Sequence, residues 1–370
     1  MPSKVNNILR SRLEGRRLGE NAARELFNSK DILSIGAAAD EIRRQLHPHG
    51  RVTYVVDRNI NYTNVCVSGC SFCAFHRPVG DAEAYVLSRE ELADKIEETV
   101  ALGGAQILMQ GGLHPDLRLD YYCDMLRFIK KEFGIHVHGF SPPEIIHFAG
   151  LEGASVADVI SQLRSAGLDT IPGGGAEILS DRVRTEISPH KCTAREWLDV
   201  MRTAHEMGMR TTATMMFGHA ESYAERVEHL GRIRDLQDST DGFTAFIPWT
   251  FQPANTRMEG TTAGGFEYLI TLAISRLFLD NIPNIQASWV TQGSKIAQLA
   301  LRFGANDLGS TMIEENVVRA AGVSFRMSLA EMRDIIEDAG FTPRQRDCYY
   351  NLIDGHPTGE DILHGNNERD

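Results

Sequence analysis

The segment VTYVVDRNINYTNVCVSGCSFCAFHR, residues 52–77, joins a strand-like run to a loop that carries three of the six cysteines of the chain. The run VTYVVD (52–57) is rich in Val and Tyr, which favours a buried β-strand. The loop places Cys66, Cys70 and Cys73 in the spacing CxxxCxxC. If this strand opens a (β/α) barrel, the loop lies at the active-site end, because the active site of such a barrel lies at the carboxyl ends of its strands.

The rest of the chain repeats the alternation of a strand-like run and an amphipathic segment. Further runs lie near 105–109 (AQILM), 135–140 (IHVHGF), 168–172 (LDTIP), 210–216 (RTTATMM), 243–248 (FTAFIP), 285–290 (IQASWV) and 303–309 (FGANDLG). Between them, Ser88, Thr193 and Ser328 each open a capping-box pattern that predicts a helix start. Polar and glycine-rich segments follow the runs, as barrel loops should. The sequence therefore predicts an α/β fold, a closed (β/α)8 barrel of TIM type.

The chain divides into three expected regions. Residues 1–50 are polar, show helical apolar spacing and lack a strand signal, so we expect an N-terminal helical extension. The barrel then spans 51–349, and a polar C-terminal tail spans 350–370.

The composition bounds the class of protein. It is 42% hydrophobic and 24% charged, which is typical of a soluble globular protein. The formal charge of −12 opposes binding to nucleic acid or to an anionic membrane surface. No stretch approaches the roughly 18 apolar residues that a membrane span needs. We expect a cytoplasmic protein whose partner is a small molecule.

The cysteines point to a metal group. In a reducing compartment six cysteines should stay unpaired, so a tight group of three suggests metal binding. One compact CxxxCxxC loop can wrap Cys66, Cys70 and Cys73 around three irons of a 4Fe-4S cubane and leave the fourth iron open. That open iron can take the amino and carboxylate groups of S-adenosylmethionine. The remaining cysteines have no partner at motif spacing and are expected to be structural thiols: Cys123, Cys192 and Cys348.

Two other interpretations of the cysteine loop stay open. His76 follows the third cysteine and completes a Cys3His set of the kind that binds structural zinc, which would give a zinc-stabilised, non-catalytic ligand-binding barrel. Structural zinc usually stabilises small folds without a core, whereas this loop belongs to a large barrel. Three unligated thiols are the second alternative, but the small residues Ser68, Gly69 and Ser71 suit a tight loop around a ligand.

With Phe72 before its last cysteine, the motif resembles that of the radical S-adenosylmethionine (SAM) superfamily. Gly111 and Gly112 resemble the GGE element that contacts the methionine amino group, although His114 stands near the place where an acid is common. Segments after the fourth and fifth strands resemble the elements that hold the ribose, the methionine carboxylate and the adenine. The resemblance implies these cofactor-binding residues: Phe72, Gly111, Gly112, Glu177, Arg182 and Met216.

From Val52 to about Arg346 the chain resembles the cyclic dehypoxanthine futalosine synthases, a radical SAM family of the futalosine route to menaquinone. The resemblance is carried by strings such as ILMQGGLHPDL, GFTAFIPWTFQP and NIQASWVTQG. Aminofutalosine synthase and the two radical enzymes that build the deazaflavin of coenzyme F420 share the framework, but they usually read NPTN where this chain has Tyr62 in NYTN. The resemblance implies a 4Fe-4S cluster and SAM as cofactors, and an electron donor such as flavodoxin or ferredoxin as a partner.

The implied reaction starts with a 5′-deoxyadenosyl radical that takes hydrogen from ribose C4′ of dehypoxanthine futalosine, and C4′ then adds to the benzoate ring. Glu177 and His219 are the expected catalytic residues, because each follows a strand end of small residues that lets a ligand approach. Side chains after strands that can hydrogen-bond a sugar or carboxylate are the expected substrate-binding residues: His114, His219, Gln252, Asn306 and Asp307. His114 could instead cap the helix that follows, and Asn306 with Asp307 could form a turn.

Overall fold

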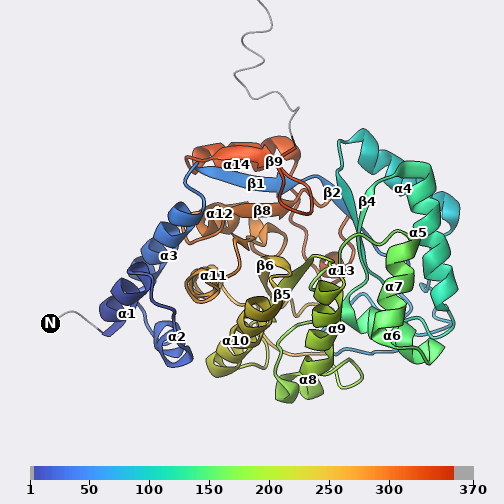
Figure 1. Ribbon diagram of the computed structural model, residues 1–370, viewed down its shortest axis with the longest axis horizontal. Coiled ribbons are helices and arrows are strands. Elements are labelled where there is room, and N and C mark those ends of the chain that lie inside the picture. Colours follow the sequence, from blue (N-terminus) through green and yellow to red (C-terminus); the bar gives the residue numbers. More distant parts are fainter. Residues whose placement is uncertain (1–3, 354–370) are drawn as a thin grey trace, which may run out of the picture.

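The computed structural model describes residues 4–353 of the chain. Three helices precede the first strand: α1 (Lys4–Leu13), α2 (Glu20–Phe27) and α3 (Ile32–Leu46). They lie together on one flank of the molecule, where α2 and α3 pack against barrel helices (Figure 1). The Arg12 side chain donates a hydrogen bond to the carbonyl of Leu277, and Arg234 donates one to the carbonyl of Leu18. These buried bonds tie the N-terminal helices to the barrel.

The barrel is made of parallel strands. They are β1 (Arg51–Val55), β2 (Asp57–Ile60), β3 (Gln106–Met109), β4 (His136–Gly139), β5 (Thr211–Phe217), β6 (Phe243–Thr250), β7 (Asn284–Ile285) and β8 (Asp307–Ser310). β1 and β2 form one first strand that is interrupted at Val56. Through β2 it pairs with β3, and through β1 it pairs with β8. The fourth strand is reduced to Thr170 and Ile171, which bridge β4 to β5, and a Gln286–Asp307 bridge joins β7 to β8. The ring closes, and the predicted (β/α)8 barrel is confirmed.

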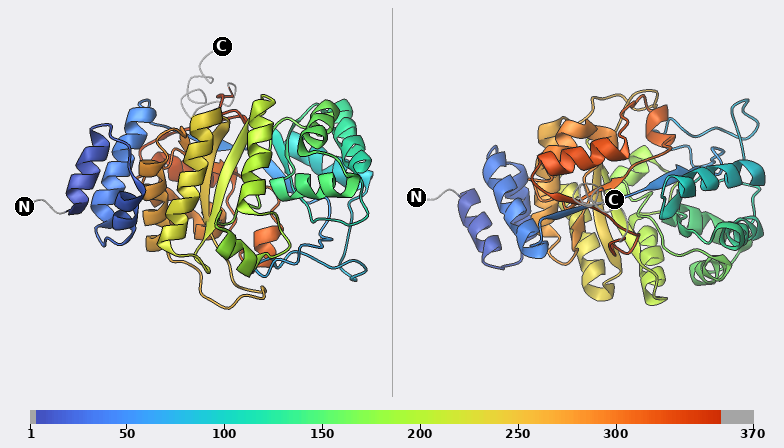
Figure 2. Two further views of the ribbon diagram at one scale, coloured as in Figure 1. Left: turned by 60° about the horizontal axis from the view of Figure 1, so that its bottom comes forward. Right: turned by 90° about the horizontal axis from the view of Figure 1, so that it is seen from above.

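Helices surround the strands, as the views in Figure 2 show. They are α4 (Arg89–Ala101), α5 (Leu119–Phe133), α6 (Pro142–Glu152), α7 (Val156–Ala166), α8 (Asp181–Ile187), α9 (Ala194–Glu206), α10 (Tyr223–Thr240), α11 (Gly265–Phe278), α12 (Trp289–Ala300), α13 (Val317–Ala320) and α14 (Leu329–Asp338). The capping boxes predicted at Ser88, Thr193 and Ser328 are all formed. Within residues 4–353 no helix is both long and apolar enough to cross a membrane.

The seventh strand is shorter than its sequence suggests. The run IQASWV predicts a strand over 285–290, but β7 ends at Ile285 and Trp289 already begins α12. The backbone N–H of Ser288 donates to the Tyr268 hydroxyl, and the Trp289 indole donates to the carbonyl of Ser310. These side-chain bonds bend the chain away from the sheet, and a short apolar run cannot distinguish a strand end from a helix start.

A further strand, β9 (Thr342–Gln345), was not predicted. Its sequence, TPRQ, lacks β-branched or apolar alternation, yet it pairs in parallel with β1 at the amino-terminal end of the first strand. The chain then turns under the barrel, where the side chains of Arg346, Cys348 and Tyr350 reach the interior. Tyr350 thus belongs to the barrel floor, while residues 354–370 of the expected tail lie outside the described residues.

Candidate active site

The three motif cysteines lie on the loop that follows β2, at the carboxyl end of the first strand. All three are free thiols, with Cys70 buried and the other two half-buried. Backbone hydrogen bonds fix the loop at several points: Cys66 N–H donates to the carbonyl of Arg77 over 3.0 Å, and Ser71 N–H donates to the carbonyl of Ile187 over 2.9 Å. The loop is therefore held both to itself and to the end of α8.

Gly111 and Gly112, just after β3, let the cysteine loop pack closely. A Cβ atom on Gly112 would overlap the carbonyl oxygen of Val65 and lie 3.0 Å from Cβ of Cys66. A Cβ atom on Gly111 would overlap the Tyr62 ring, coming within 2.9 Å of Cε1. Any side chain here would push the cysteine loop away, so the two glycines have a packing role beside the cofactor contact that the sequence implies.

Glu144, at the start of α6, joins the loops that follow the first three strands. Its Oε1 accepts from the Tyr62 hydroxyl over 2.5 Å and from Gly111 N–H over 3.0 Å. Its Oε2 accepts from the backbone and the hydroxyl of Ser141 over 2.7 and 2.5 Å. Burial raises the pKa of Glu144, and the four donors oppose that rise. The capping-box spacing of Ser141 and Glu144 was visible in the sequence, but its link to Tyr62 was not.

Lys191, whose side chain is only slightly exposed, is a cation beside the cysteine loop, and sequence reasoning missed it. Its Nζ lies 2.7 Å from Oε1 of Glu177 and 5.2 Å from the ring centroid of Phe72. Burial alone lowers the pKa of Lys191, but the Cys70 and Glu177 charges raise it above its ordinary value. Glu177 holds a left-handed backbone conformation, with φ of 43°, which is uncommon outside glycine and marks functional sites. A lone Lys in a loop carries no sequence signal.

His219 and Arg182 are engaged away from the barrel interior. The His219 side chain is fully buried, its Nδ1 accepts from Ala220 N–H over 2.7 Å, and its Nε2 donates to the carbonyl of Met216 over 3.0 Å. Arg182 is half exposed and ion-paired with Glu225 at 2.6 Å, and this bond lowers the pKa of Glu225 to about 2. Both side chains shape the ends of β5 and α8 through internal bonds.

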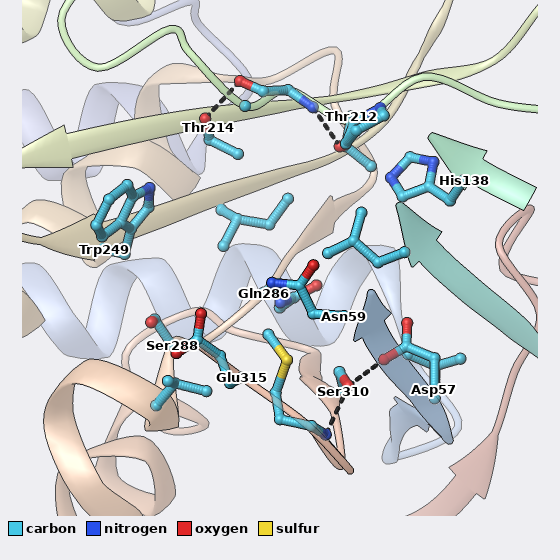
Figure 3. A pocket seen from close by; sticks show the side chains of 18 of the residues that line it. Asp57, Asn59, His138, Thr212, Thr214, Trp249, Gln286, Ser288, Ser310 and Glu315 are labelled. Atoms are coloured by element: carbon cyan, nitrogen blue, oxygen red, sulfur yellow. Dashed lines mark hydrogen bonds between the residues drawn. The ribbon is translucent and has the colours of Figure 1, made fainter. Parts of the chain in front are cut away.

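A cavity of about 260 Å³ lies inside the barrel (Figure 3). Its wall runs from strand ends such as Gln110 and Ser288 down to Arg346 and Tyr350 on the floor. Figure 3 shows polar side chains from several strands around it, with the Trp249 ring on one side. A concave site with a few converging polar groups is the usual form of a small-molecule site.

The side chains expected to bind substrate do not line this cavity. Nδ1 of His114 accepts from the backbone N–H of Asp116, a turn bond that precedes α5, so His114 does not cap that helix, whose N-cap is Arg118. The Gln252 amide donates to Thr250. Asn306 accepts from Arg276 over 2.6 Å, and Asp307, which starts β8, pairs with Arg346 over 2.6 Å. All side-chain polar atoms of Asn306 and Asp307 are bonded within the barrel, and His114 and Gln252 each make local bonds outside the cavity.

The carboxyl, imidazole and guanidinium groups that line the cavity are hydrogen-bonded or ion-paired within the protein. Asp57 accepts from the Gln106 amide over 2.8 Å and from the Ser310 hydroxyl, and burial raises its pKa. Burial also lowers the pKa of His138 to about 3, so its ring is neutral. Arg346 is the one Lys or Arg among the described lining residues, and its guanidinium is bound to Asp307. The cavity therefore suits a substrate held by hydrogen bonds and apolar contact.

The geometry also bears on the kind of metal group. Within residues 4–353 no three His, Cys, Asp or Glu side chains converge tightly enough to hold a single metal ion. Nδ1 of His76 lies 2.8 Å from the carbonyl oxygen of Cys73, so that ring is engaged within its own loop. A cubane takes each thiolate on a different iron and needs the sulfurs spread apart. The three thiols on one anchored loop fit the cluster better than a Cys3His zinc site.

Two family profiles match most of the chain. The Radical SAM superfamily matches residues 60–233, from the end of the first strand to α10. The CofH/MqnC C-terminal region matches residues 240–357. The chain belongs to the radical SAM superfamily. It is a radical SAM enzyme, and its cofactors are a 4Fe-4S cluster and SAM.

Relatives of this radical SAM protein span nearly its whole length. It is 48% identical to cyclic dehypoxanthine futalosine synthase of Halalkalibacterium halodurans, over 94% of this chain and 95% of that protein. It is 44% identical to the enzyme of the same name from Streptomyces coelicolor, over 94% and 89%. It is also 43% identical to 5-amino-6-(D-ribitylamino)uracil–L-tyrosine 4-hydroxyphenyl transferase of Archaeoglobus fulgidus, over 85% and 92%.

Solved structures share the fold at low sequence identity. Methylornithine synthase superposes with a TM-score of 0.71 at 18% identity, over 91% of this chain and 97% of its own. The FeFe-hydrogenase maturase of Carboxydothermus hydrogenoformans superposes with a TM-score of 0.75 at 17% identity, over 94% and 80%. Both likenesses support the radical SAM barrel and carry no argument about substrate.

Proposed function

We propose that this protein cyclises dehypoxanthine futalosine to cyclic dehypoxanthine futalosine in menaquinone biosynthesis. The observation that carries the proposal is the 48% identity, along 94% of the chain, to an enzyme named for that product. The cavity inside the barrel, lined by side chains from several strands, supports it, because a radical reaction needs a substrate that is held still.

The cofactor sites follow from the loops at the carboxyl ends of the strands. Cys66, Cys70 and Cys73 would hold the cluster through three thiolates. When bound, the cluster and SAM supply a 5′-deoxyadenosyl radical that removes a hydrogen atom from the substrate. Lys191 and Glu177 would place one cation and one anion beside Phe72, which suits a cosubstrate that carries both a carboxylate and ribose hydroxyls.

The task of the chain in the chemical step is to orient the substrate and accept a proton. The hydrogen atom of C4′ goes to the 5′-deoxyadenosyl radical, and C4′ bonds to the benzoate ring. The ring then gives one proton to a base and one electron to a one-electron acceptor, a role that the oxidised form of the electron-transfer protein proposed below can fill. Asp57 and Glu315 line the cavity, and burial raises the pKa of both carboxyl groups, so either is a candidate base. Glu177 and His219 remain our predictions for the reaction, Glu177 as a catalytic residue and His219 as a positioning residue whose internal bonds hold the loop after β5.

The test is anaerobic reconstitution followed by mass spectrometry of the products. With reductant, SAM and dehypoxanthine futalosine, we expect a product two hydrogen atoms lighter than the substrate, together with 5′-deoxyadenosine. An unchanged substrate would contradict the proposal.

Relatives at 43% identity favour a second candidate, the 4-hydroxyphenyl transferase. A parallel reaction with tyrosine and 5-amino-6-(D-ribitylamino)uracil should give no product, whereas product only in that arm would select the transferase. A covalent adduct of SAM, formed without release of 5′-deoxyadenosine, would select an aminofutalosine synthase-type reaction instead.

We also propose a flavodoxin or ferredoxin as electron donor and a cytoplasmic location. The cysteine loop reaches the surface, since Val67 between the first two cysteines is half exposed. A reduced flavodoxin should support turnover in place of a chemical reductant, and failure of flavodoxin and ferredoxin alike would argue against this partner class.

A further inference from the structure

Two glutamine side chains face the cavity with unengaged amides. Gln110 follows β3 and Gln286 follows β7, so both stand at carboxyl ends of strands. Both are half-buried and line the cavity, and Figure 3 shows Gln286 among the side chains around its middle. No hydrogen bond joins either amide to another residue between 4 and 353, although the backbone of each is bonded within the barrel.

Each amide lies against a glycine of another strand end. A Cβ atom on Gly174 would overlap Nε2 of Gln110 and lie 3.4 Å from its Cδ. A Cβ atom on Gly309 would overlap Nε2 of Gln286 and lie 2.6 Å from its Cδ. Two separate glycines thus leave space for two amides that bind nothing in the protein. Glycine at a strand end commonly marks close approach of another group.

Most other polar groups of the wall are already engaged. The Thr212 hydroxyl accepts from Gly173 N–H, and the Thr214 hydroxyl donates to the carbonyl of Gly173. The hydroxyls of Ser288 and Thr291 are bonded to each other. The two amides are therefore groups of the wall that can hydrogen-bond an incoming molecule without first breaking a bond in the protein.

We propose that Gln110 and Gln286 bind hydroxyl groups of the pentose in the substrate, and that Gly174 and Gly309 position them. This inference rests on the proposed function and specifies how its substrate is held. An amide donates through N–H and accepts through its carbonyl, which matches hydroxyls, whereas its carbonyl oxygen would repel a carboxylate. Gln110 follows β3 and Gln286 follows β7, and the first strand and β8 lie between these two strands in the barrel. The two glutamines therefore hold the sugar from different sides.

The glycines provide a test in which the protein should still fold. Gly174 has an ordinary backbone conformation, and the atom that its new Cβ would displace is the flexible end of Gln110. Gly174→Ala should therefore move the amide without unfolding the barrel. Gly150→Ala, at a position with open space around it, is the matched control.

The second pair of variants, Gly309→Ala and Gly208→Ala, separates backbone strain from loss of the amide. Gly309 and Gly208 both have left-handed backbones, with φ of 72° and 80°. Gly208 has nothing within 4 Å of a new Cβ, so Gly208→Ala carries the same strain without touching an amide. Direct truncation by Gln110→Leu and Gln286→Leu completes the set.

The first two readouts are KM for dehypoxanthine futalosine and the amount of 5′-deoxyadenosine released per cyclised product. The third is the dissociation constant of the substrate, measured through the fluorescence of Trp249 and Trp289, which line the cavity. Loss of one hydrogen bond should raise KM and the dissociation constant by about 10- to 100-fold. More 5′-deoxyadenosine should be wasted per product, while iron and sulfide content match the controls.

Two results would overturn the assignment in different ways. Suppose that the wild type cyclises dehypoxanthine futalosine. If Gly174→Ala, Gly309→Ala, Gln110→Leu and Gln286→Leu all keep the wild-type KM and dissociation constant, the amides do not hold the sugar. If the wild type neither binds nor converts this substrate, the proposed function fails and the assignment fails with it.

Discussion

Glu144→Gln should weaken the support of the cysteine loop by a measurable amount. The carboxylate accepts four hydrogen bonds, two on each oxygen. In the Glu144→Gln variant an NH2 group takes the place of one of those oxygens. This NH2 group cannot accept a hydrogen bond, yet it faces one hydroxyl donor and one backbone N–H donor. The hydroxyl of Tyr62 or Ser141 can rotate away, but the backbone N–H of Gly111 or Ser141 cannot. One buried N–H is left unpaired at about 1–3 kcal/mol, and one charge-assisted bond is lost at about 1.5–3 kcal/mol. Together these ranges span about 2.5–6 kcal/mol, and because the hydroxyl can reorient and relieve part of the loss, we expect about 3 kcal/mol.

The assay is urea unfolding under anaerobic conditions, followed by circular dichroism and, separately, by the visible absorbance of the cluster. The free energy of unfolding should fall by about 3 kcal/mol, with the absorbance lost no later than the helical signal. Glu206→Gln is the control, because Glu206 is exposed near the end of α9, and such surface changes stay within about 0.5 kcal/mol. If Glu144→Gln unfolds at the same urea concentration as the wild type, the Glu144 carboxylate does not hold the three loops together.

Three further outcomes follow from other buried groups. Arg346→Leu leaves Asp307 fully buried without its partner, and urea unfolding should show a loss of about 3–5 kcal/mol; a loss under 1 kcal/mol would contradict the pairing. Burial lowers the pKa of His138 and of His229 to about 3. Between pH 6.5 and pH 3 these two rings therefore bind protons in the unfolded chain but not in the folded protein. The free energy of unfolding should fall as the pH falls through this range, by up to about 1.4 kcal/mol per pH unit for each ring. Thermal unfolding of His138→Asn between pH 6.5 and 5 should show a shallower pH dependence than the wild type, and equal slopes would count against this. His219→Ala should abolish cyclisation while the visible absorbance of the cluster persists, and normal turnover by that variant would remove His219 from the mechanism.

The barrel was predictable because its signals are local. Each strand carries its own apolar run, and the capping boxes at Ser88, Thr193 and Ser328 mark helix starts within four residues. β9 escaped prediction because the polar segment Thr342–Gln345 becomes a strand only by pairing with β1, which lies far away in the sequence. Such a tertiary contact overrides local propensity and leaves no periodic pattern.

The candidate site was predictable in part for the same reason. The three cysteines stand within eight residues, so their spacing alone indicated a metal loop. Polar residues after strands predicted the substrate-binding residues less well. Residue type does not show whether a side chain is already hydrogen-bonded within the protein or is available to a ligand. Asn306 and Gln252 are bonded internally, whereas the Gln286 amide is open only because Gly309, on the next strand, leaves room for it. That distinction requires coordinates.

The fate of the hydrogen atom on C4′ shows whether the protein starts cyclisation at that carbon. Dehypoxanthine futalosine carrying deuterium at C4′ is converted anaerobically by the reconstituted enzyme, and the 5′-deoxyadenosine is analysed by mass spectrometry. We expect one deuterium in each 5′-deoxyadenosine formed with product and none at C4′ of the cyclised product, where the new carbon–carbon bond has replaced it. Unlabelled 5′-deoxyadenosine, with deuterium retained in the product, would contradict this expectation.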